Sequence, residues 1–212
     1  MGLGYRWHTY FYLQYPYPPD LVRYKLTFIE EEHMGQYLNP GKINYQMSVN
    51  SDIFIDKSEM IHYLNMAVQT QQRYVSVSRP RRFGKTMAAD MICAYYDKEA
   101  DSRKMFSSLK IAKASYDDKS PWDKYLGKFD VIRIVMTKFT RNKNSFNDAL
   151  DSMQMLVSRE IKKKYPDVDY FDDKDLIQTL EDVYVEKEQQ FIIVIDEWDA
   201  VFREFPLDKE GR

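Results

Sequence analysis

The sequence predicts an α/β fold in which helices flank a parallel β-sheet. Residues 74–86 read as a strand, a tight loop and the start of a helix, and residues 130–136 and 191–195 read as buried strands. Strands that alternate with helical segments indicate a parallel sheet with crossover helices. Three strands are too few for the whole fold, so we expect this sheet to be incomplete.

The first stretch, residues 74–86, reads YVSVSRPRRFGKT and precedes a helical segment. A helix that begins near Gly84 directs its unpaired N–H groups into the loop, and its dipole favours an anion there. Gly84 has no Cβ and lets the backbone approach a phosphate. Lys85 would reach the terminal phosphates, and the Thr86 hydroxyl would bind Mg²⁺. The pattern predicts a phosphate-binding loop of the Walker A type.

One position of this loop departs from the usual Walker A pattern. Arg79 stands where that pattern has its first glycine, and a Gly-Lys-Thr tripeptide also occurs by chance. A solvated basic turn that starts a helix is therefore the alternative. Arg81 and Arg82 could contact phosphate or a neighbouring subunit, and a surface role suits them equally.

A second stretch, residues 191–204, reads FIIVIDEWDAVFRE and places two acids after five apolar residues. Such a run suits a central parallel strand that is covered on both faces. Ligands of open α/β sheets bind at the carboxyl ends of the strands, which would place Asp196 and Glu197 on the same rim as the loop. There Asp196 could hold a water of Mg²⁺, and Glu197 could orient or deprotonate the attacking water. Two acids that solubilise a strand end are the alternative.

The other elements follow from periodicity and end signals. Asp56 and Glu59 form a capping-box pattern for a helix that reaches about residue 71. Residues 144–164 form an amphipathic helix that ends in three lysines before a proline, and residues 176–188 form another helix. Residues 37–56 read as a loop. Cys93, the single cysteine, excludes a disulfide within the chain and is expected to be a small buried hydrophobe.

Four stretches resemble the AAA-ATPase-like family of bacterial proteins, a P-loop group. They are MGQYLNPGKINY at 34–45, DIFIDKSEMIHYLN at 52–65, VSRPRRFGKTMAADMICAYYD at 77–97 and IDEWD at 195–199. In that family the Ser-Arg-Pro-Arg-Arg-Phe-Gly-Lys-Ser/Thr loop is itself the phosphate loop, so the resemblance makes Arg79 a family trait. It implies a P-loop ATPase domain with an AAA-like parallel sheet, a Walker A-like loop at 79–86 and a Walker B strand at 191–197.

The resemblance also implies a site for ATP and Mg²⁺. Its catalytic residues would be Glu197 and Lys85, and its metal ligands Thr86 and Asp196. The residues of the loop that would contact ATP are Arg81, Arg82, Phe83, Gly84, Lys85 and Thr86.

The resemblance begins at Met34 and implies two parts, residues 1–33 and a partial AAA-ATPase-like domain at 34–212. The first part is rich in tyrosine, and we interpret it as an extension that precedes a natural start at Met34. A surface that stacks nucleic-acid bases is the alternative. In the family a further strand and often a restriction-endonuclease-like nuclease domain follow the Walker B strand. We therefore expect a chain that is incomplete at its C-terminus. We expect this chain to bind ATP, but the resemblance does not predict that it hydrolyses ATP by itself.

The amino-acid composition limits the classes of partner that the chain is expected to bind. With 31 basic and 33 acidic residues, the net charge of −2 gives no general attraction to nucleic acid or membranes. No apolar window could span a bilayer and no signal peptide is visible, so we expect a cytoplasmic protein without a membrane partner. The resemblance implies a nuclease domain and nucleic acid as partners of full-length relatives, and an oligomer is compatible with it. A non-catalytic interaction or nucleic-acid-binding module that uses the basic loop 79–85 is the alternative function.

Overall fold

The computed structural model describes residues 35–78, 83–113, 121–172 and 174–206. Residues 1–34 lie outside this part of the chain, so the expected N-terminal extension is not tested. In chain order the elements are α1 (Ile43–Val49), α2 (Met60–Ala67), α3 (Lys85–Tyr96), α4 (Arg103–Phe106), α5 (Lys110–Lys113), β1 (Asp130–Val135), α6 (Met136–Thr140), α7 (Phe146–Lys164), α8 (Leu176–Lys187), β2 (Phe191–Asp196) and α9 (Ala200–Glu204).

The two strands of the described residues form a parallel pair. Asp130 pairs with Phe191 at one end, and Val135 pairs with Asp196 at the other. Two of the three predicted strands are thus confirmed nearly to the residue. The chain has the mixed helix and strand structure expected of an α/β protein.

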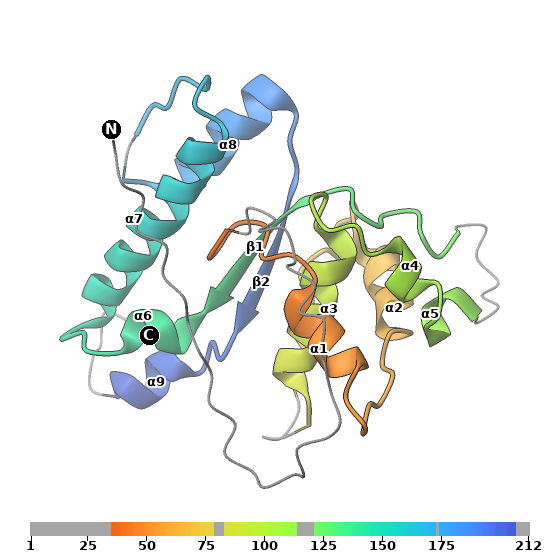
Figure 1. The fold of residues 1–212 in the computed structure, drawn as a ribbon. Coiled ribbons are helices and arrows are strands. Elements are labelled where there is room, and N and C mark those ends of the chain that lie inside the picture. Colours follow the sequence, from red (N-terminus) through yellow and green to blue (C-terminus); the bar gives the residue numbers. More distant parts are fainter. Residues whose placement is uncertain (1–34, 79–82, 114–120, 173, 207–212) are drawn as a thin grey trace, which may run out of the picture. The chain divides into compact units, whose positions relative to one another are not determined.

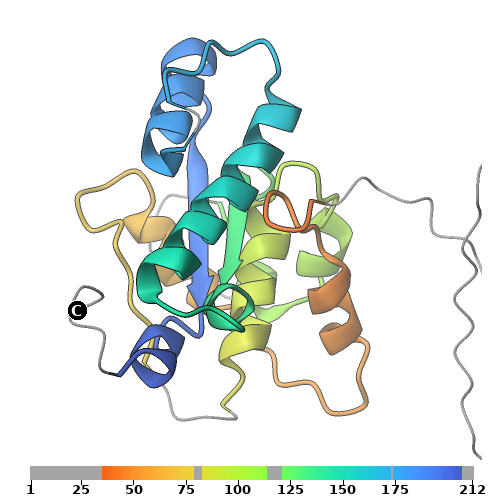
Figure 2. The same cartoon turned by 90° about the vertical axis from the view of Figure 1, so that its left-hand side faces the viewer.

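Helices lie on both sides of this pair, and they cover β1 more completely than β2. Figure 1 shows α7 and α8 on one side of the strands and α1 to α5 on the other. In the view of Figure 2, α7 crosses in front of both strands. Alternation along β1 explains the two layers, because Ile132 and Ile134 pack toward α7 while Val131 packs toward α3.

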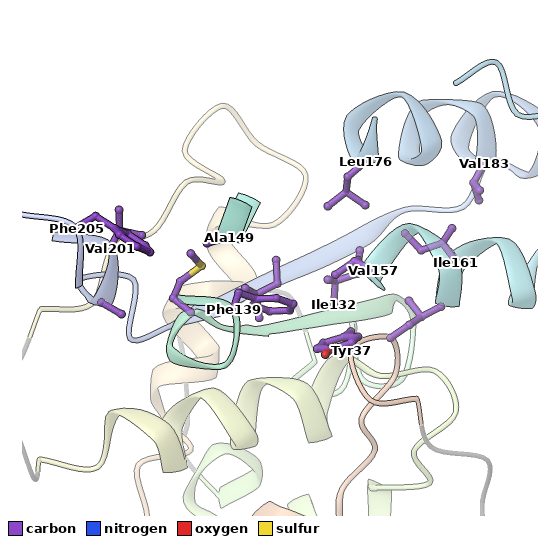
Figure 3. Close-up of a cluster of buried hydrophobic side chains, with 14 of the residues drawn as sticks. Tyr37, Ile132, Phe139, Ala149, Val157, Ile161, Leu176, Val183, Val201 and Phe205 are labelled. Carbon is purple, nitrogen blue, oxygen red and sulfur yellow. The ribbon is translucent and has the colours of Figure 1, made fainter. Parts of the chain in front are cut away.

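One core cluster, drawn in Figure 3, joins β1 to the helices of the α7 side. Val157 and Ile161 of α7, Ile132 of β1 and Val183 of α8 are completely buried in it. The opposite cluster packs α3 against α1, α2, α4 and α5, and it contains Cys93. Burial raises the pKa of the Cys93 thiol to about 12, which confirms the expected buried hydrophobe.

Capping side chains define the starts of the two long helices near the sheet. The Ser145 hydroxyl accepts a hydrogen bond of 3.1 Å from the Asp148 N–H at the start of α7. The Asp175 carboxylate accepts bonds from the N–H groups of Ile177 and Gln178 at the start of α8. Both predicted helices are confirmed to within two residues.

The predicted strand at residues 74–78 is wrong in the described structure. These residues adopt no regular structure, every side chain is exposed, and Tyr74 has an exposed fraction of 83%. A strand needs a neighbour to satisfy its N–H and C=O groups. Among the described residues, no backbone hydrogen bond joins this segment to another one. The alternating pattern is present, but the part of the chain that the structure describes contains no pairing partner for it.

Two further differences concern the region before the loop. Residues 43–49 form α1 where a loop was predicted, and Tyr45 anchors this helix in the core. The capping box of Asp56 and Glu59 does not form, and α2 begins at Met60 and ends at Ala67. The Asp56 carboxylate instead accepts hydrogen bonds from the N–H groups of Ser58, at 2.8 Å, and Lys110, at 2.7 Å. No helix among the described residues is long and apolar enough to cross a membrane.

Candidate functional site

The carboxyl ends of β1 and β2 meet at one rim of the sheet. Because Val135 pairs with Asp196 in parallel register, the residues that follow both strands leave the sheet at the same edge. There the Thr137 hydroxyl donates a hydrogen bond of 2.6 Å to Oε2 of Glu197. Asp196 and Glu197 stand at the end of a strand as predicted, but that strand is not buried on both faces. Among the described residues β2 pairs only with β1, and Ile193 and Ile195 have exposed fractions of 49% and 52%.

The start of α3 lies toward the same rim. The far end of α3 returns to the amino end of β1, where Asp97 bridges to Phe129 and the Lys98 N–H donates to the Phe129 carbonyl at 2.9 Å. The helix therefore runs back along the strands, and its first residue, Lys85, is directed toward their carboxyl ends. In this geometry a helix N-terminus faces a ligand at the carboxyl ends of the strands, although no strand precedes α3 among the described residues.

Gly84 immediately precedes α3 in a left-handed conformation, with φ of 76°. Residues with a Cβ adopt this conformation at a cost. A Cβ added here would lie 3.1 Å from Nζ of Lys57. The glycine predicted from the loop pattern is thus required by the backbone.

The remaining loop positions fall into two groups. Thr86 is exposed in the first turn of α3, and Phe83 is exposed with its carbonyl turned toward a lysine. Arg81 and Arg82 lie outside the described residues, and their predicted contacts with ATP stay predictions.

A second lysine at the loop was missed from the sequence. Nζ of Lys57 donates a hydrogen bond of 2.6 Å to the Phe83 carbonyl, which puts an ammonium group beside Gly84. The bonds to the Asp56 carboxylate fix the backbone next to it. Burial alone would raise the pKa of Asp56, but the hydrogen bonds from Ser58 and Lys110 outweigh it and lower that pKa.

Arg133 of β1 links the loop helix to the acidic strand, and it too was missed. Its Nη2 lies 3.1 Å from Oδ2 of Asp196 and 3.5 Å from Oδ1 of Asp90, which belongs to α3. Arg133 and Asp196 each have an exposed fraction of only 7%. The signal in the sequence was a single charged residue inside the apolar run of residues 131–136.

The environment of Asp90 reflects this crowding of charge. Burial raises the pKa of the Asp90 carboxyl above its ordinary value; Arg133 opposes the rise, and the nearby Asp196 carboxylate adds to it. Asp90 lies five residues after Lys85, so the start of α3 is about 7.5 Å further along the helix axis. The triad of Asp90, Arg133 and Asp196 therefore lies between the loop helix and the sheet, just below the rim.

Glu197 has an unusual backbone conformation for its residue type. Its φ is 52°, and its N–H donates a hydrogen bond of 3.0 Å to Oδ1 of Asp196. Non-glycine residues in this region are uncommon and often mark functional sites. The turn directs the Glu197 side chain away from the buried strand and into contact with Thr137 at the exposed rim.

The donor set at this rim suits Mg²⁺ bound together with phosphates. Thr86 and Asp196 offer oxygen ligands, and Mg²⁺ usually combines one or two protein oxygens with substrate phosphates and waters. No group of three or more His, Cys, Asp or Glu side chains in the described ranges could hold a metal by itself.

A comparison with models of protein families shows to which family the chain belongs. The model of the AAA-ATPase-like family, described as predicted AAA-ATPase, matches residues 44–209. The chain belongs to this family. Searches of curated proteins and of solved structures found no match to it.

Membership of the AAA-ATPase-like family supports an ATPase-like function in general terms. The match spans the loop, the Asp196 and Glu197 pair and the residues that sequence reasoning missed, namely Lys57, Arg133 and Thr137. In this AAA-ATPase-like chain, α3 follows the predicted loop and β2 carries the predicted acidic pair. Arg133 connects these two elements, because it contacts Asp90 of α3 and Asp196 of β2.

Proposed function

We propose that the chain is an ATP-binding P-loop ATPase domain whose nucleotide lies at the rim formed by the start of α3 and the ends of β1 and β2. The observation that carries the proposal is the bridge from Asp90 through Arg133 to Asp196, because it ties the loop helix to the acidic strand. Family membership supports the same class of function.

The phosphates would be held by the loop and the first turn of α3. The N–H groups at the helix start and the ammonium of Lys85 offer positive charge to the β- and γ-phosphates, and Gly84 permits close approach. Arg81, Arg82 and Phe83 would line the same loop. Lys57 adds a further ammonium beside Gly84.

Mg²⁺, bound with the nucleotide, would neutralise phosphate charge. Thr86 would donate its hydroxyl oxygen as a ligand, and Asp196 would hold a coordinated water. Glu197, exposed and hydrogen-bonded to Thr137, would orient or deprotonate the water that attacks the γ-phosphate. Lys85 would stabilise the charge that develops on the transferred group.

The thermal midpoint with and without Mg-ATP tests this proposal. A ligand that binds only the folded state adds about 2.7 kcal/mol at a hundredfold excess over its dissociation constant. We expect Mg-ATP to raise the midpoint of wild type and to leave that of Lys85→Ala unchanged. The control is Lys128→Ala, which changes an exposed lysine just before the amino end of β1 and should respond as wild type does. A cooperative thermal transition of wild type whose midpoint does not change with Mg-ATP would contradict the proposal and favour an interaction module.

Hydrolysis is tested separately, with Glu197→Gln. This variant keeps the size of the side chain and removes the base, so it should bind Mg-ATP as wild type does and lose phosphate release. Equal phosphate release by both proteins would remove Glu197 from the proposed mechanism.

A further inference from the structure

The triad of Asp90, Arg133 and Asp196, in which Asp90 is only partly buried, has a use beyond joining two elements. Two carboxylates and one guanidinium leave an excess of one negative charge below the rim, when both carboxylates are ionised. The nearest carboxylate oxygen of Asp196 is 3.1 Å from Arg133, so a protein cation already lies against the carboxylate assigned to the Mg²⁺ water.

The guanidinium of Arg133 makes hydrogen bonds through only one of its two terminal nitrogens among the described residues. Both of its contacts to the carboxylates use Nη2, whereas Nη1 is buried and has no hydrogen-bond partner among the described residues. A buried donor without an acceptor is costly, and within the described ranges the guanidinium is held in place by its contacts with the two carboxylates alone.

We propose that Arg133 is a positioning residue that keeps divalent cations from binding at Asp196 until phosphates arrive with them. This inference rests on the proposed function, in which Asp196 holds a water of Mg²⁺. The guanidinium of Arg133 offsets part of the charge of the two carboxylates and so weakens their attraction for a free divalent cation. The phosphates of a nucleotide add the negative charge that favours binding of the cation.

The contacts on both sides of Arg133 explain why its position is defined. Asp90 holds it from α3 and Asp196 from β2, while its own backbone N–H donates to the Tyr37 carbonyl at 2.7 Å. Replacement by an apolar side chain of similar length would leave the buried carboxylate of Asp196 and the partly buried carboxylate of Asp90 without the cation between them. Such a pair attracts a divalent cation without any nucleotide.

The test measures cation binding in the absence of nucleotide. The probe is Mn²⁺, whose free concentration is read by electron paramagnetic resonance, and thermal midpoints are recorded in parallel. Wild type should bind Mn²⁺ weakly and keep its midpoint. Arg133→Met should bind Mn²⁺ at least about tenfold more tightly and gain thermal stability with it. Arg133→Met combined with Asp196→Asn should lose the gain.

Two further variants keep the test decisive. Arg159→Met, on α7, is the matched control and should bind Mn²⁺ as wild type does. If Arg133→Met does not fold even with Mn²⁺, Arg133→Gln decides instead. Glutamine removes the positive charge and keeps a hydrogen-bond donor for the carboxylates, so Mn²⁺ should bind several-fold more tightly. Equal Mn²⁺ affinity of wild type and the folded Arg133 variant would overturn the proposal.

The outcome separates this inference from the proposed function. Failure of wild type to bind Mg-ATP removes the nucleotide site but does not change Mn²⁺ binding without nucleotide. Normal Mg-ATP binding together with unchanged Mn²⁺ affinity in the Arg133 variants removes only the role of Arg133.

Discussion

The hydroxyl of Thr137 donates a hydrogen bond of 2.6 Å to the carboxylate of Glu197 at the carboxyl ends of the two strands. Both residues directly follow the sheet elements, Thr137 one residue into α6 and Glu197 immediately after β2. The contact fixes the orientation of the side chain proposed as the base. It also gives the proposed chemistry a residue that can be changed without touching the phosphate loop.

Replacement of Thr137 by valine removes the hydroxyl and keeps the shape of the side chain. We expect the rate of ATP hydrolysis to fall about fivefold, because an orienting hydrogen bond contributes on the order of 1 kcal/mol. The affinity for Mg-ATP should not change. Phosphate release and nucleotide titration measure the two quantities, and Thr137→Ser should restore the rate. A weakened affinity at an unchanged rate would show that Thr137 acts on binding instead.

Lys57 places its ammonium beside Gly84 through the 2.6 Å bond to the Phe83 carbonyl. Lys57→Met should raise the dissociation constant for ATP about tenfold, since one charge near the phosphates is lost. The loss should shrink in high salt, which screens exposed charges. Fluorescence titration at two salt concentrations measures this. Lys104→Met, an exposed lysine on α4, is the control, and equal affinity in both variants would exclude Lys57 from the site.

Gly84→Ala introduces a Cβ at a residue whose φ is 76°. The left-handed conformation should cost about 1 kcal/mol of the free energy of unfolding, and nucleotide binding should be lost because the loop must shift. Gly127→Ala is a matched control, since Gly127 also has a positive φ, of 63°, but lies near the amino end of β1. We expect a similar loss of stability with normal binding there. Normal ATP binding by Gly84→Ala would contradict the assigned loop geometry.

Asp130 is completely buried at the amino end of β1, away from the proposed site. It accepts hydrogen bonds from Asn39 at 2.6 Å and Lys164 at 2.7 Å, and Lys98 lies 3.0 Å away. Burial alone would raise the pKa of Asp130, but the bonds from Lys164, Tyr165, Asn39 and Lys98 outweigh it. They hold that pKa below its ordinary value of 3.8.

A carboxyl group whose pKa is lower in the folded than in the unfolded state stabilises the protein above the unfolded value. This contribution is lost as the pH falls through the folded value. Asp130→Asn should therefore reduce the free energy of unfolding by about 3 kcal/mol at neutral pH. The difference from wild type should narrow below about pH 4. Urea unfolding at several pH values tests this, with the exposed Asp151→Asn as control. If the difference in the free energy of unfolding between wild type and Asp130→Asn stays constant below about pH 4, the role assigned to Asp130 is contradicted.

The sequence was sufficient for the elements whose patterns are local. Strand β2 follows from five apolar residues that precede Asp196, and helix α7 follows from its amphipathic pattern and from the three lysines before a proline that mark its end. Gly84 was found from the Gly-Lys-Thr pattern, because a residue without a Cβ lets the backbone approach a phosphate. In each case neighbouring residues carry the signal.

The elements that the sequence did not reveal depend on contacts between distant residues. Alternation at residues 74–78 predicts a strand, but periodicity cannot supply a pairing partner. Arg133 meets Asp196 only because the register pairs Val135 with Asp196, which no single segment encodes. Lys57 is 26 residues from Phe83 along the chain, and only the fold brings its ammonium to the loop.

Isothermal titration calorimetry of ATP in the presence of Mg²⁺ tests the central claim most directly. It compares wild type with Lys85→Ala and the control Lys128→Ala. We predict one nucleotide per chain in wild type and in Lys128→Ala, and no measurable binding in Lys85→Ala. Equal binding by Lys85→Ala and wild type, or no binding by a folded wild-type protein, would contradict the assignment of the site.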